Sequence, residues 1–189
     1  FDDCRLPASA LIGEEGRAFY YISAGLERAR AHTAARAIGL ARGALEDATV
    51  KKVEEILVAK KLDQLVEVRN PIDINPGADD EAHLQVSEAF LQDPNIDAVV
   101  VGLDPTAPSV RALVESKLRP GHDISDPKST VHLMPPIVER NDKPLIGIVD
   151  GGTLYDAMAA GLMDRGVCVF RNCARGTRAA TECPSRMST

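Results

Sequence analysis

The sequence predicts an α/β protein, in which a parallel sheet of about four strands has helices on both faces and a long α-helix precedes it. Short apolar runs alternate with amphipathic stretches from about residue 50 onward. The connections between the runs are long enough for the right-handed helical crossovers that join parallel strands. Residues 19–48 repeat apolar side chains at three- and four-residue steps, which is typical of one helix.

Composition limits the classes of protein to consider. The chain has 189 residues, 44% of them hydrophobic and 26% charged, which fits one packed domain with an appendage and excludes a largely disordered chain. The net charge of −6 argues against a nucleic-acid partner, because such proteins concentrate Lys and Arg. No apolar run reaches the length of a membrane span, and no signal pattern opens the chain.

The four cysteines show no paired spacing, and three of them lie at or beyond Cys168. They are too clustered for a disulfide framework, so we expect a reducing, cytoplasmic location. The first residue is Phe1 rather than Met, from which we expect a fragment or a processed product.

Residues 1–48 open with an extended stretch to Pro7 and a turn at Gly13 and Gly16, followed by the predicted helix. Small residues such as Ala34, Ala35 and Gly39 would let another helix approach closely. The segment resembles acyl-CoA dehydrogenases at the point where the middle β-domain meets the C-terminal helical domain. The matching segments are Phe1 to Pro7, Ile12 to Gly16, Leu26 to Arg30 and Ala37 to Leu45. The flavin-contacting and catalytic parts of that family have no counterpart here, so no flavin or base role falls on any residue.

Residues 49–181 form the second predicted domain, and 182–189 a frayed tail. We expect helices at 53–62, from about 79 to 91, 109–118, 136–141 and 153–163, and strands at 65–68, 97–103, 145–149 and 167–170. Residues 174–181 contain no Leu or Ile, which puts the covering of one sheet face in doubt.

Ligands of parallel sheets gather beyond the carboxyl ends of the strands. Three loops leave strands there: 70–77, 102–109 and 150–153. The Gly151-Gly152 pair before Thr153 can aim backbone N–H groups at an anion, although such a pair can equally be a tight strand-to-helix connection. The turn lacks the residues of a Walker loop and of a dinucleotide-binding fingerprint.

The segments Val66–Asp80, Asp93–Leu103, Lys143–Gly152 and Gly166–Arg171 carry a second resemblance. In their order, their spacing and the sequences of their loops, they resemble the second flavodoxin-like, or CoA-ligase, domain of NDP-forming acyl-CoA synthetases. Such enzymes are acid-thiol ligases that work through an acyl phosphate and a phosphohistidine. The resemblance implies that this domain helps to frame the phosphohistidine site. Candidates for facing the phosphate are Asn70, Asp73, Asp79, Gly151, Gly152 and Thr153.

The resemblance also implies parts that this chain lacks: the CoA-binding domain, the ATP-grasp domain and the phosphorylated His. We therefore expect no catalytic residue, no metal site and no cofactor bound to the chain alone. CoA and ATP or ADP with Mg²⁺ belong to the complete enzyme, whose missing domains or subunits would be the partners. Whether the chain is an enzyme is left open.

The remaining reactive side chains are expected to be structural. His83 should lie on the surface of a helix, His32, His122 and His132 lack partners at metal-ligand spacing, and Cys168 should be an inert core residue. Two alternatives to a partial ligase module stay open: an assembly module that recruits a helix-packing partner through residues 19–48, and a remnant of an FAD-dependent acyl-CoA dehydrogenase.

Overall fold

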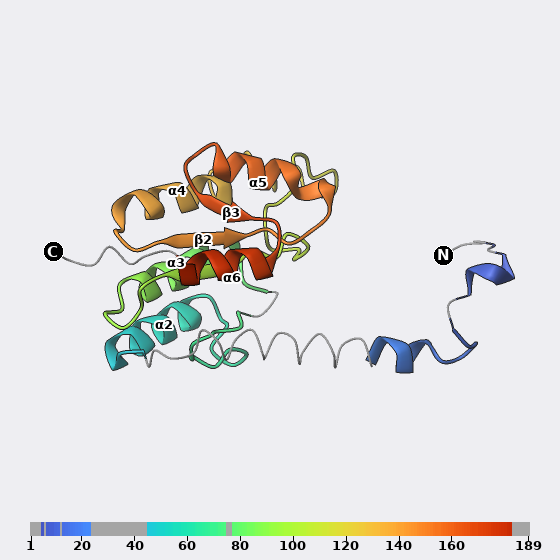
Figure 1. Ribbon diagram of the computed structural model, residues 1–189, viewed down its shortest axis with the longest axis horizontal. Coiled ribbons are helices and arrows are strands. Elements are labelled where there is room, and N and C mark those ends of the chain that lie inside the picture. Colours follow the sequence, from blue (N-terminus) through green and yellow to red (C-terminus); the bar gives the residue numbers. More distant parts are fainter. Residues whose placement is uncertain (1–4, 6, 12, 24–44, 75–76, 183–189) are drawn as a thin grey trace. The chain divides into compact units, whose positions relative to one another are not determined.

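The computed structural model describes the 189-residue chain except for residues 1–4, 6, 12, 24–44, 75–76 and 183–189 (Figure 1). The chain divides into two units, residues 1–42 and 43–189. The first unit contains the 3-10 helix η1 (Ala8–Ala10) and a helical stretch at residues 18–23. Most of the predicted helix at 19–48 lies outside the described residues. Residues 45–46 are not helical, and the predicted domain boundary at 49 falls inside the helix that follows.

The second unit is an α/β fold. Its elements are α2 (Asp47–Ala59), α3 (Asp80–Leu91), β1 (Val99–Gly102), α4 (Thr130–Arg140), β2 (Leu145–Ile148), η2 (Thr153–Tyr155), α5 (Asp156–Met163), β3 (Cys168–Phe170) and α6 (Cys173–Glu182). The strands form one sheet in the order β1-β2-β3, and both pairs are parallel. The predicted α/β class and parallel sheet are therefore confirmed, with three strands in the sheet. No described helix is long and apolar enough to cross a membrane.

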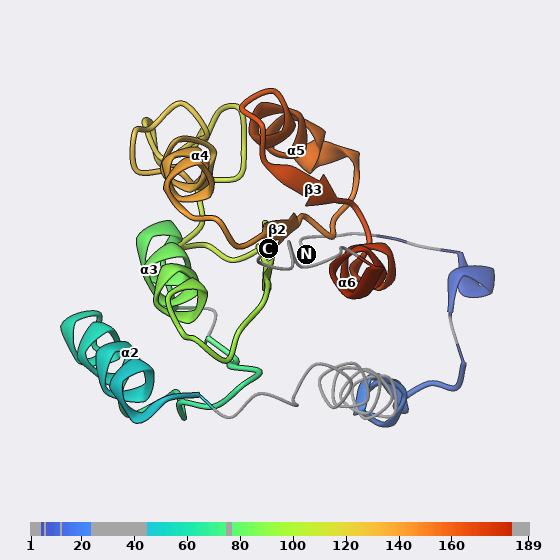
Figure 2. The ribbon, with the colours of Figure 1, turned by 60° about the vertical axis from the view of Figure 1, so that its left-hand side comes forward.

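The two faces of the sheet are covered unequally (Figure 2). A Cβ atom at Gly147 would point to Met134 of α4, whereas its neighbour Ile148 contacts Gly176 of α6. Helices α3, α4 and α5 therefore lie on one face and α6 lies on the other, as Figure 2 shows. The helix α2 packs on the outside of α3.

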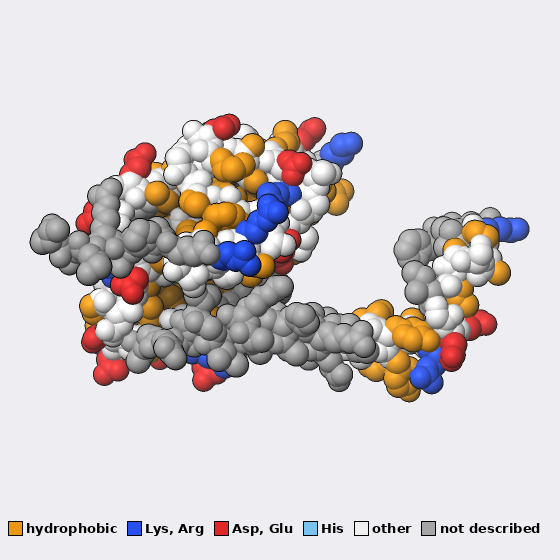
Figure 3. All heavy atoms as spheres, in the orientation of Figure 1, with side chains coloured by type: hydrophobic (Ala, Val, Ile, Leu, Met, Phe, Trp, Pro, Cys, Tyr) orange, Lys and Arg blue, Asp and Glu red, His pale blue; other side chains and the backbone are white. Residues whose placement is uncertain are grey.

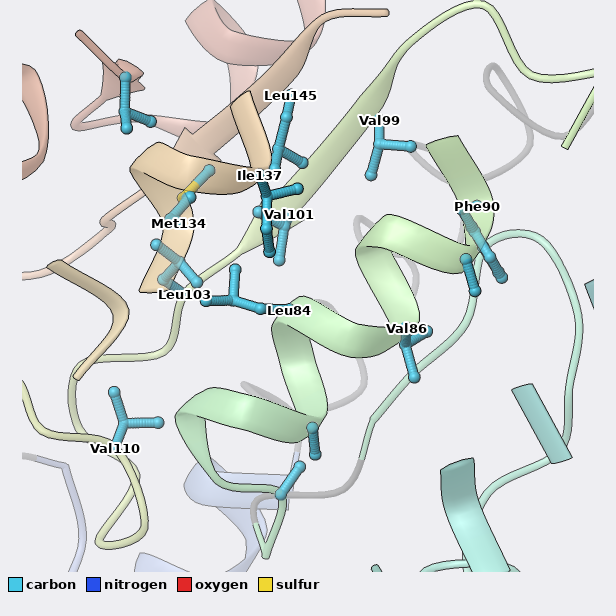
Figure 4. Close-up of a cluster of buried hydrophobic side chains, with 14 of the residues drawn as sticks. Leu84, Val86, Phe90, Val99, Val101, Leu103, Val110, Met134, Ile137 and Leu145 are labelled. Carbon is cyan, nitrogen blue, oxygen red and sulfur yellow. The ribbon is translucent and has the colours of Figure 1, made fainter. Parts of the chain in front are cut away.

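The main core lies between α3, α4 and the sheet. Figure 4 shows Leu84, Val101 and Leu103 meeting Met134 and Ile137. All five side chains are at most 7% exposed. Every residue of β2 is buried, which explains why a continuous apolar run rather than an alternating one encodes this strand.

Glycine at position 176 sets the distance between α6 and the sheet. A Cβ there would lie 2.9 Å from Cδ1 of Ile148 and 3.4 Å from Cδ2 of Phe170. The helix therefore approaches the sheet through backbone rather than through large side chains. This contact is how a segment without Leu or Ile still covers the face.

Three of the predicted elements differ from the structure. Residues 65–68 belong to no strand, although Val66 is buried in the hydrophobic core. Residues 109–118 form no helix. There Val110 and Ala112 are buried in alternation, while Leu118 is 96% exposed, so the helical spacing of the apolar residues is not used.

The helix predicted at 136–141 begins six residues earlier, at Thr130, and includes Pro135 and Pro136. Its nominal N-cap, Ser129, makes no side-chain capping bond. An acceptor from elsewhere in the chain caps it instead, as described below.

Candidate functional site

The four helices that flank the sheet, α3 to α6, all begin at the same edge of it. Helices α4 and α5 each connect one parallel strand to the next, and α6 follows the last strand, so all three begin where a strand ends. Helix α3 leads into the start of β1, so it ends at the opposite edge of the sheet and begins at the same edge as the other three. The strands' carboxyl ends and the helix N-termini therefore share an edge. Partial positive charge from the helix ends accumulates there, as expected for the binding edge of such folds.

The Gly151-Gly152 turn lies at this edge directly after β2. A Cβ at Gly151 would lie 2.7 Å from Cδ2 of Tyr155 and 3.1 Å from Cγ of Pro105, so a larger residue would not fit without a shift. Gly152 adopts an ordinary extended conformation, with φ −69 and ψ −176. The turn leads into η2 at Thr153, and its shape depends on the first glycine.

Arg171, which follows β3, braces this turn. Its Nη2 donates to the carbonyl oxygens of Gly151 at 2.8 Å and Gly152 at 2.9 Å, and its Nη1 donates to that of Tyr155 at 3.1 Å. The same guanidinium pairs with Asp156 at 2.9 Å. In a trans peptide the C=O and the next N–H point in opposite directions. The N–H groups of Gly152 and Thr153 therefore point away from Arg171, on the same side of the turn.

The start of α3 has a different character, because its own carboxylates occupy it. Asp79 caps the helix by accepting from the N–H of Ala82 at 2.8 Å, and Lys60 lies 3.2 Å from its Oδ2 and also pairs with Glu81. Burial opposes the charge of Asp79, but the Ala82 N–H and the Lys60 ammonium outweigh it and lower the pKa of this carboxyl. The same two carboxylates raise the pKa of Lys60 against the opposing effect of burial.

Of the other predicted candidates, Asn70 is half-buried and Asp73 is exposed in the segment before α3. The Asn70–Pro71 peptide bond is cis. No described contact joins either residue to the Gly151-Gly152 turn. Their proposed role toward a phosphate stays a prediction.

The loop after β1 connects the two regions. Ser109 donates to the carbonyl oxygen of Ala78, next to the α3 cap, at 2.7 Å. Pro105 of the same loop lies beside Gly151. The loop after β1 thus contacts both Ala78, directly before the α3 cap, and the Gly151-Gly152 turn.

A buried carboxylate fixes that loop to two helices. Asp80 is completely buried, and its Oδ1 accepts from the N–H and the hydroxyl of Thr130 at 2.9 and 2.6 Å. Its Oδ2 accepts from the N–H and Nη1 of Arg111, both at 3.1 Å. Arg111 in turn pairs with Asp126 at 2.7 Å. Asp80 therefore caps α4 from a position 50 residues earlier and anchors the loop after β1.

The expectations for isolated reactive side chains need two corrections. His83 is buried, not on the surface, because its ring lies against the α3 cap with Nδ1 2.9 Å from the carbonyl oxygen of Asp79. Cys168 is exposed, not part of the core, because it starts the edge strand β3. His122 and His132 are half-buried, and His32 lies outside the described residues. No three His, Cys, Asp or Glu side chains form a metal-ligand group in the part of the chain that the structure describes.

The sequence analysis did not single out Arg171 and Arg111, the two arginines that hold the loops at this edge. Arg171 follows a strand at the edge where ligands gather, and that position was a usable signal. Arg111 carried no signal, because a helix was expected at 109–118 and its partner Asp80 lies 31 residues away.

No family model matches the chain. Acryloyl-CoA reductase (NADH) of Anaerotignum propionicum is 47% identical over 55 residues, which make up 29% of this chain and 14% of that protein. Cyclohex-1-ene-1-carbonyl-CoA dehydrogenase of Syntrophus aciditrophicus strain SB is 46% identical over 48 residues, 25% of this chain and 12% of that protein. The chain thus spans 12 to 14% of the length of these curated relatives, a short and partial match of the kind expected for a dehydrogenase-like segment.

Among solved structures, the crystal structure of PH0766 from Pyrococcus horikoshii OT3 matches with a TM-score of 0.55 and 18% sequence identity. The match covers 73% of this chain and 28% of that one. At this identity the likeness concerns the fold alone. The chain therefore combines an α/β unit of flavodoxin-like fold, found also as one part of a longer protein, with a short stretch similar to acyl-CoA enzymes.

Proposed function

We propose that residues 49–181 are a partial module of an NDP-forming acyl-CoA synthetase, an acid-thiol ligase component that is not catalytic alone. In this proposal the module presents the Gly151–Thr153 turn to a phosphoryl group held by a companion domain. It acts in the cytoplasm with separate CoA-binding and ATP-grasp domains or subunits, which supply CoA and ATP or ADP with Mg²⁺.

The observation that carries the proposal is the braced turn. Arg171 holds the carbonyl groups of Gly151 and Gly152 on one side, so that two N–H groups face the other side. Neighbouring N–H groups that point in one direction form a concavity suited to an anion. The first N–H groups of a helix have no intrahelical acceptor, which leaves donors at Thr153 and beyond for a ligand.

The electrostatics of the edge favour this turn over the start of α3. At that helix start Asp79 already accepts from the N–H of Ala82, a donor that a phosphate would need, and Lys60 and Arg111 are already paired with the carboxylates of Asp79, Asp80 and Glu81. The glycines of the turn carry no charged side chain; of the acidic residues next to it, Asp156 is paired with Arg171, and Asp150, directly before Gly151, is exposed. The turn is therefore the stronger of the predicted anion-facing elements. The likeness to one part of the longer PH0766 chain supports a module that works within a larger assembly.

Calorimetry tests the proposal. Inorganic phosphate, CoA and Mg-ADP are titrated into the full chain, alone and with recombinant CoA-binding and ATP-grasp proteins. We expect phosphate to bind and acyl-CoA to form only when both companions are present. Gly151→Ala should weaken phosphate binding because its Cβ meets Tyr155 and Pro105, whereas Gly102→Ala, where the Cβ meets open space, serves as the matched control. No binding of any of the three ligands, even with companions, would count against a ligase module.

A second candidate is an assembly module built on the N-terminal segment, and a third is a remnant of an FAD-dependent acyl-CoA dehydrogenase. The short curated matches favour the third candidate, and exposed apolar side chains in the first unit favour the second. Phe19 is 75% exposed, Tyr20 60% and Ile22 63%, an arrangement that suits packing against a helix of a partner.

Deletion of residues 1–48 separates the two candidates. Loss of self-association or of partner binding in the shortened chain supports assembly through this segment. An unchanged oligomeric state in light scattering excludes the assembly module. Retention of added FAD by the purified full chain, seen as flavin absorbance after desalting, would favour the dehydrogenase remnant. A colourless protein would dispose of it.

A further inference from the structure

Asp150 and Gly151 form an Asp-Gly pair at the point where the chain leaves β2 and enters the Gly151-Gly152 turn. No other aspartate or asparagine in the sequence precedes a glycine. The backbone nitrogen of the residue after an aspartate can attack the side-chain carbon Cγ and close a five-membered imide ring. A glycine permits this attack best, because it has no Cβ to obstruct the nitrogen and few limits on its backbone angles. The sequence therefore concentrates this reaction at a single peptide bond.

The nitrogen of Gly151 is not engaged in the fold. No described residue accepts a hydrogen bond from its N–H or donates one to the carbonyl oxygen of Asp150. The residues on either side, by contrast, are held. The N–H of Val149 donates to the carbonyl oxygen of Phe170 at 3.0 Å, and Arg171 donates to that of Gly151 at 2.8 Å. The peptide unit between Asp150 and Gly151 therefore has no described hydrogen bond of its own to break when it rotates.

The side chain of Asp150 is open to solvent. Asp150 is exposed, and no described group forms an ion pair or a hydrogen bond with its carboxylate. Figure 3 shows Lys and Arg side chains on the surface over α6 and the segment before it, so this part of the molecule faces water. The carboxylate is thus free to turn towards Gly151, and water can reach the ring that forms.

We propose that Asp150 is a site of spontaneous isomerisation to isoaspartate. The nitrogen of Gly151 forms a bond to Cγ of Asp150, and a carboxylate oxygen leaves as water with the N–H proton and a proton from solvent. Water then opens the imide ring. Addition at Cγ restores aspartate, whereas addition at the backbone carbonyl carbon breaks its bond to the Gly151 nitrogen and leaves the main chain running through Cγ. One water leaves and one enters, so the reaction needs no other reactant.

An isoaspartate at this position disturbs the packed turn. It adds one carbon atom to the main chain directly before Gly151, where even a Cβ would lie 2.7 Å from Cδ2 of Tyr155 and 3.1 Å from Cγ of Pro105. The hydrogen bonds from Arg171 to the carbonyl groups of the turn depend on the position of the turn and are lost with it. In the unmodified chain the same bonds oppose the movement that ring closure requires, so Arg171 slows the reaction.

The test follows the full chain during incubation at neutral pH and physiological temperature. Isoaspartate is quantified with an isoaspartyl methyltransferase and located by mass spectrometry after digestion with a protease that cleaves before aspartate but not before isoaspartate. We expect cleavage before Asp150 to be lost with time, whereas cleavage before Asp97, which is exposed and precedes Ala98, is retained. Asp150→Glu keeps the charge but would need a six-membered ring, so it should gain no isoaspartyl signal.

Two further rates test the role of the fold. Arg171→Gln should isomerise about fivefold faster than the wild type, which corresponds to the loss of about 1 kcal/mol of hydrogen bonding. Arg140→Gln, which removes a remote paired arginine, should leave the rate unchanged. Retained cleavage before Asp150 in the folded chain, over a time in which the urea-unfolded chain loses it, overturns the inference. An unchanged rate in Arg171→Gln overturns the restraint assigned to Arg171.

Phosphate titration of fresh and incubated chain distinguishes this inference from the proposed function. Only the expected loss of phosphate binding rests on the proposed function. Binding that falls in proportion to the isoaspartate content supports both. Isomerisation of a chain that binds no phosphate when fresh keeps this inference and counts against the proposed function. Undiminished phosphate binding by fully isomerised chain overturns the disturbance of the turn.

Discussion

Replacement of Asp80 tests whether one carboxylate connects α3, α4 and the loop after β1. Asp80→Ala removes the acceptor of four hydrogen bonds, two from Thr130 and two from Arg111, in a completely buried position. Breaking a buried charged pair by removing one partner costs about 3–5 kcal/mol, and loss of a helix cap alone costs about 1 kcal/mol. We therefore expect the free energy of unfolding to fall by about 4 kcal/mol.

Asp80→Asn should cost about half as much, roughly 2 kcal/mol, since its amide oxygen can still accept from Thr130 while its NH2 group faces the donors of Arg111. Urea unfolding followed by circular dichroism measures both losses. Asp97→Asn, an exposed residue before β1, is the control and should stay within about 0.5 kcal/mol of the wild type. A loss below about 1 kcal/mol for Asp80→Ala would refute the capping role, because it would mean that other groups satisfy the same donors.

Three further predictions follow from single contacts. Gly176→Val should lower the free energy of unfolding by about 1–3 kcal/mol in urea unfolding, because its Cβ would lie 2.9 Å from the Ile148 side chain; an unchanged value would mean that α6 does not depend on this close approach. Burial opposes the charged form of Asp93, but hydrogen bonds from Thr49 and from backbone N–H groups outweigh burial and lower the pKa of this carboxyl. The charged Asp93 therefore stabilises the fold at neutral pH, and this stabilisation is lost as the pH falls through the folded-state pKa. Asp93→Asn should accordingly destabilise more at pH 7 than at pH 3, and equal losses would contradict the assignment. Arg171→Gln should weaken phosphate binding about tenfold, while Arg140→Gln, which removes a remote paired arginine, should not.

The buried parts of the fold could be predicted from the sequence because their patterns need no knowledge of partners. The run Leu145–Val149 is buried throughout, and a continuous apolar run is what a central parallel strand requires. The helix beginning at Asp79 was equally readable, since acidic residues at a helix start follow from local electrostatics. The parallel arrangement followed from the order of the elements.

The elements that were predicted wrongly depend on contacts between residues far apart in the sequence. Alternation at 65–68 indicates burial of one face, which Val66 shows, but pairing into a sheet requires a neighbouring strand that the pattern cannot reveal. The spacing of Val110 and Leu118 fits a helix, yet Arg111 is held by Asp80 and the chain stays irregular. The start of α4 was displaced for the same reason, since its cap comes from that aspartate.

Only part of the candidate site could be predicted from the sequence. Glycines after a strand mark a turn by their own chemistry, so Gly151 and Gly152 could be singled out without a structure. The bracing of their carbonyl groups by Arg171 joins residues 19 and 20 positions apart and is a property of the folded sheet. The expected surface position of His83 failed similarly, because helical position alone does not show which face α2 and the loops cover.

The glycine contact of α6 with the sheet also bears on how the molecule opens. Among the described helices α6 is alone on its face, and it contributes no leucine or isoleucine to the interior. Segments with few apolar contacts exchange their amide hydrogens through local openings that cost less than global unfolding. Helix α6 should therefore behave as a separate cooperative unit that detaches and reattaches while the α3–α4 layer stays closed. Each detachment would expose Ile146 and Ile148 to solvent for the lifetime of the open state.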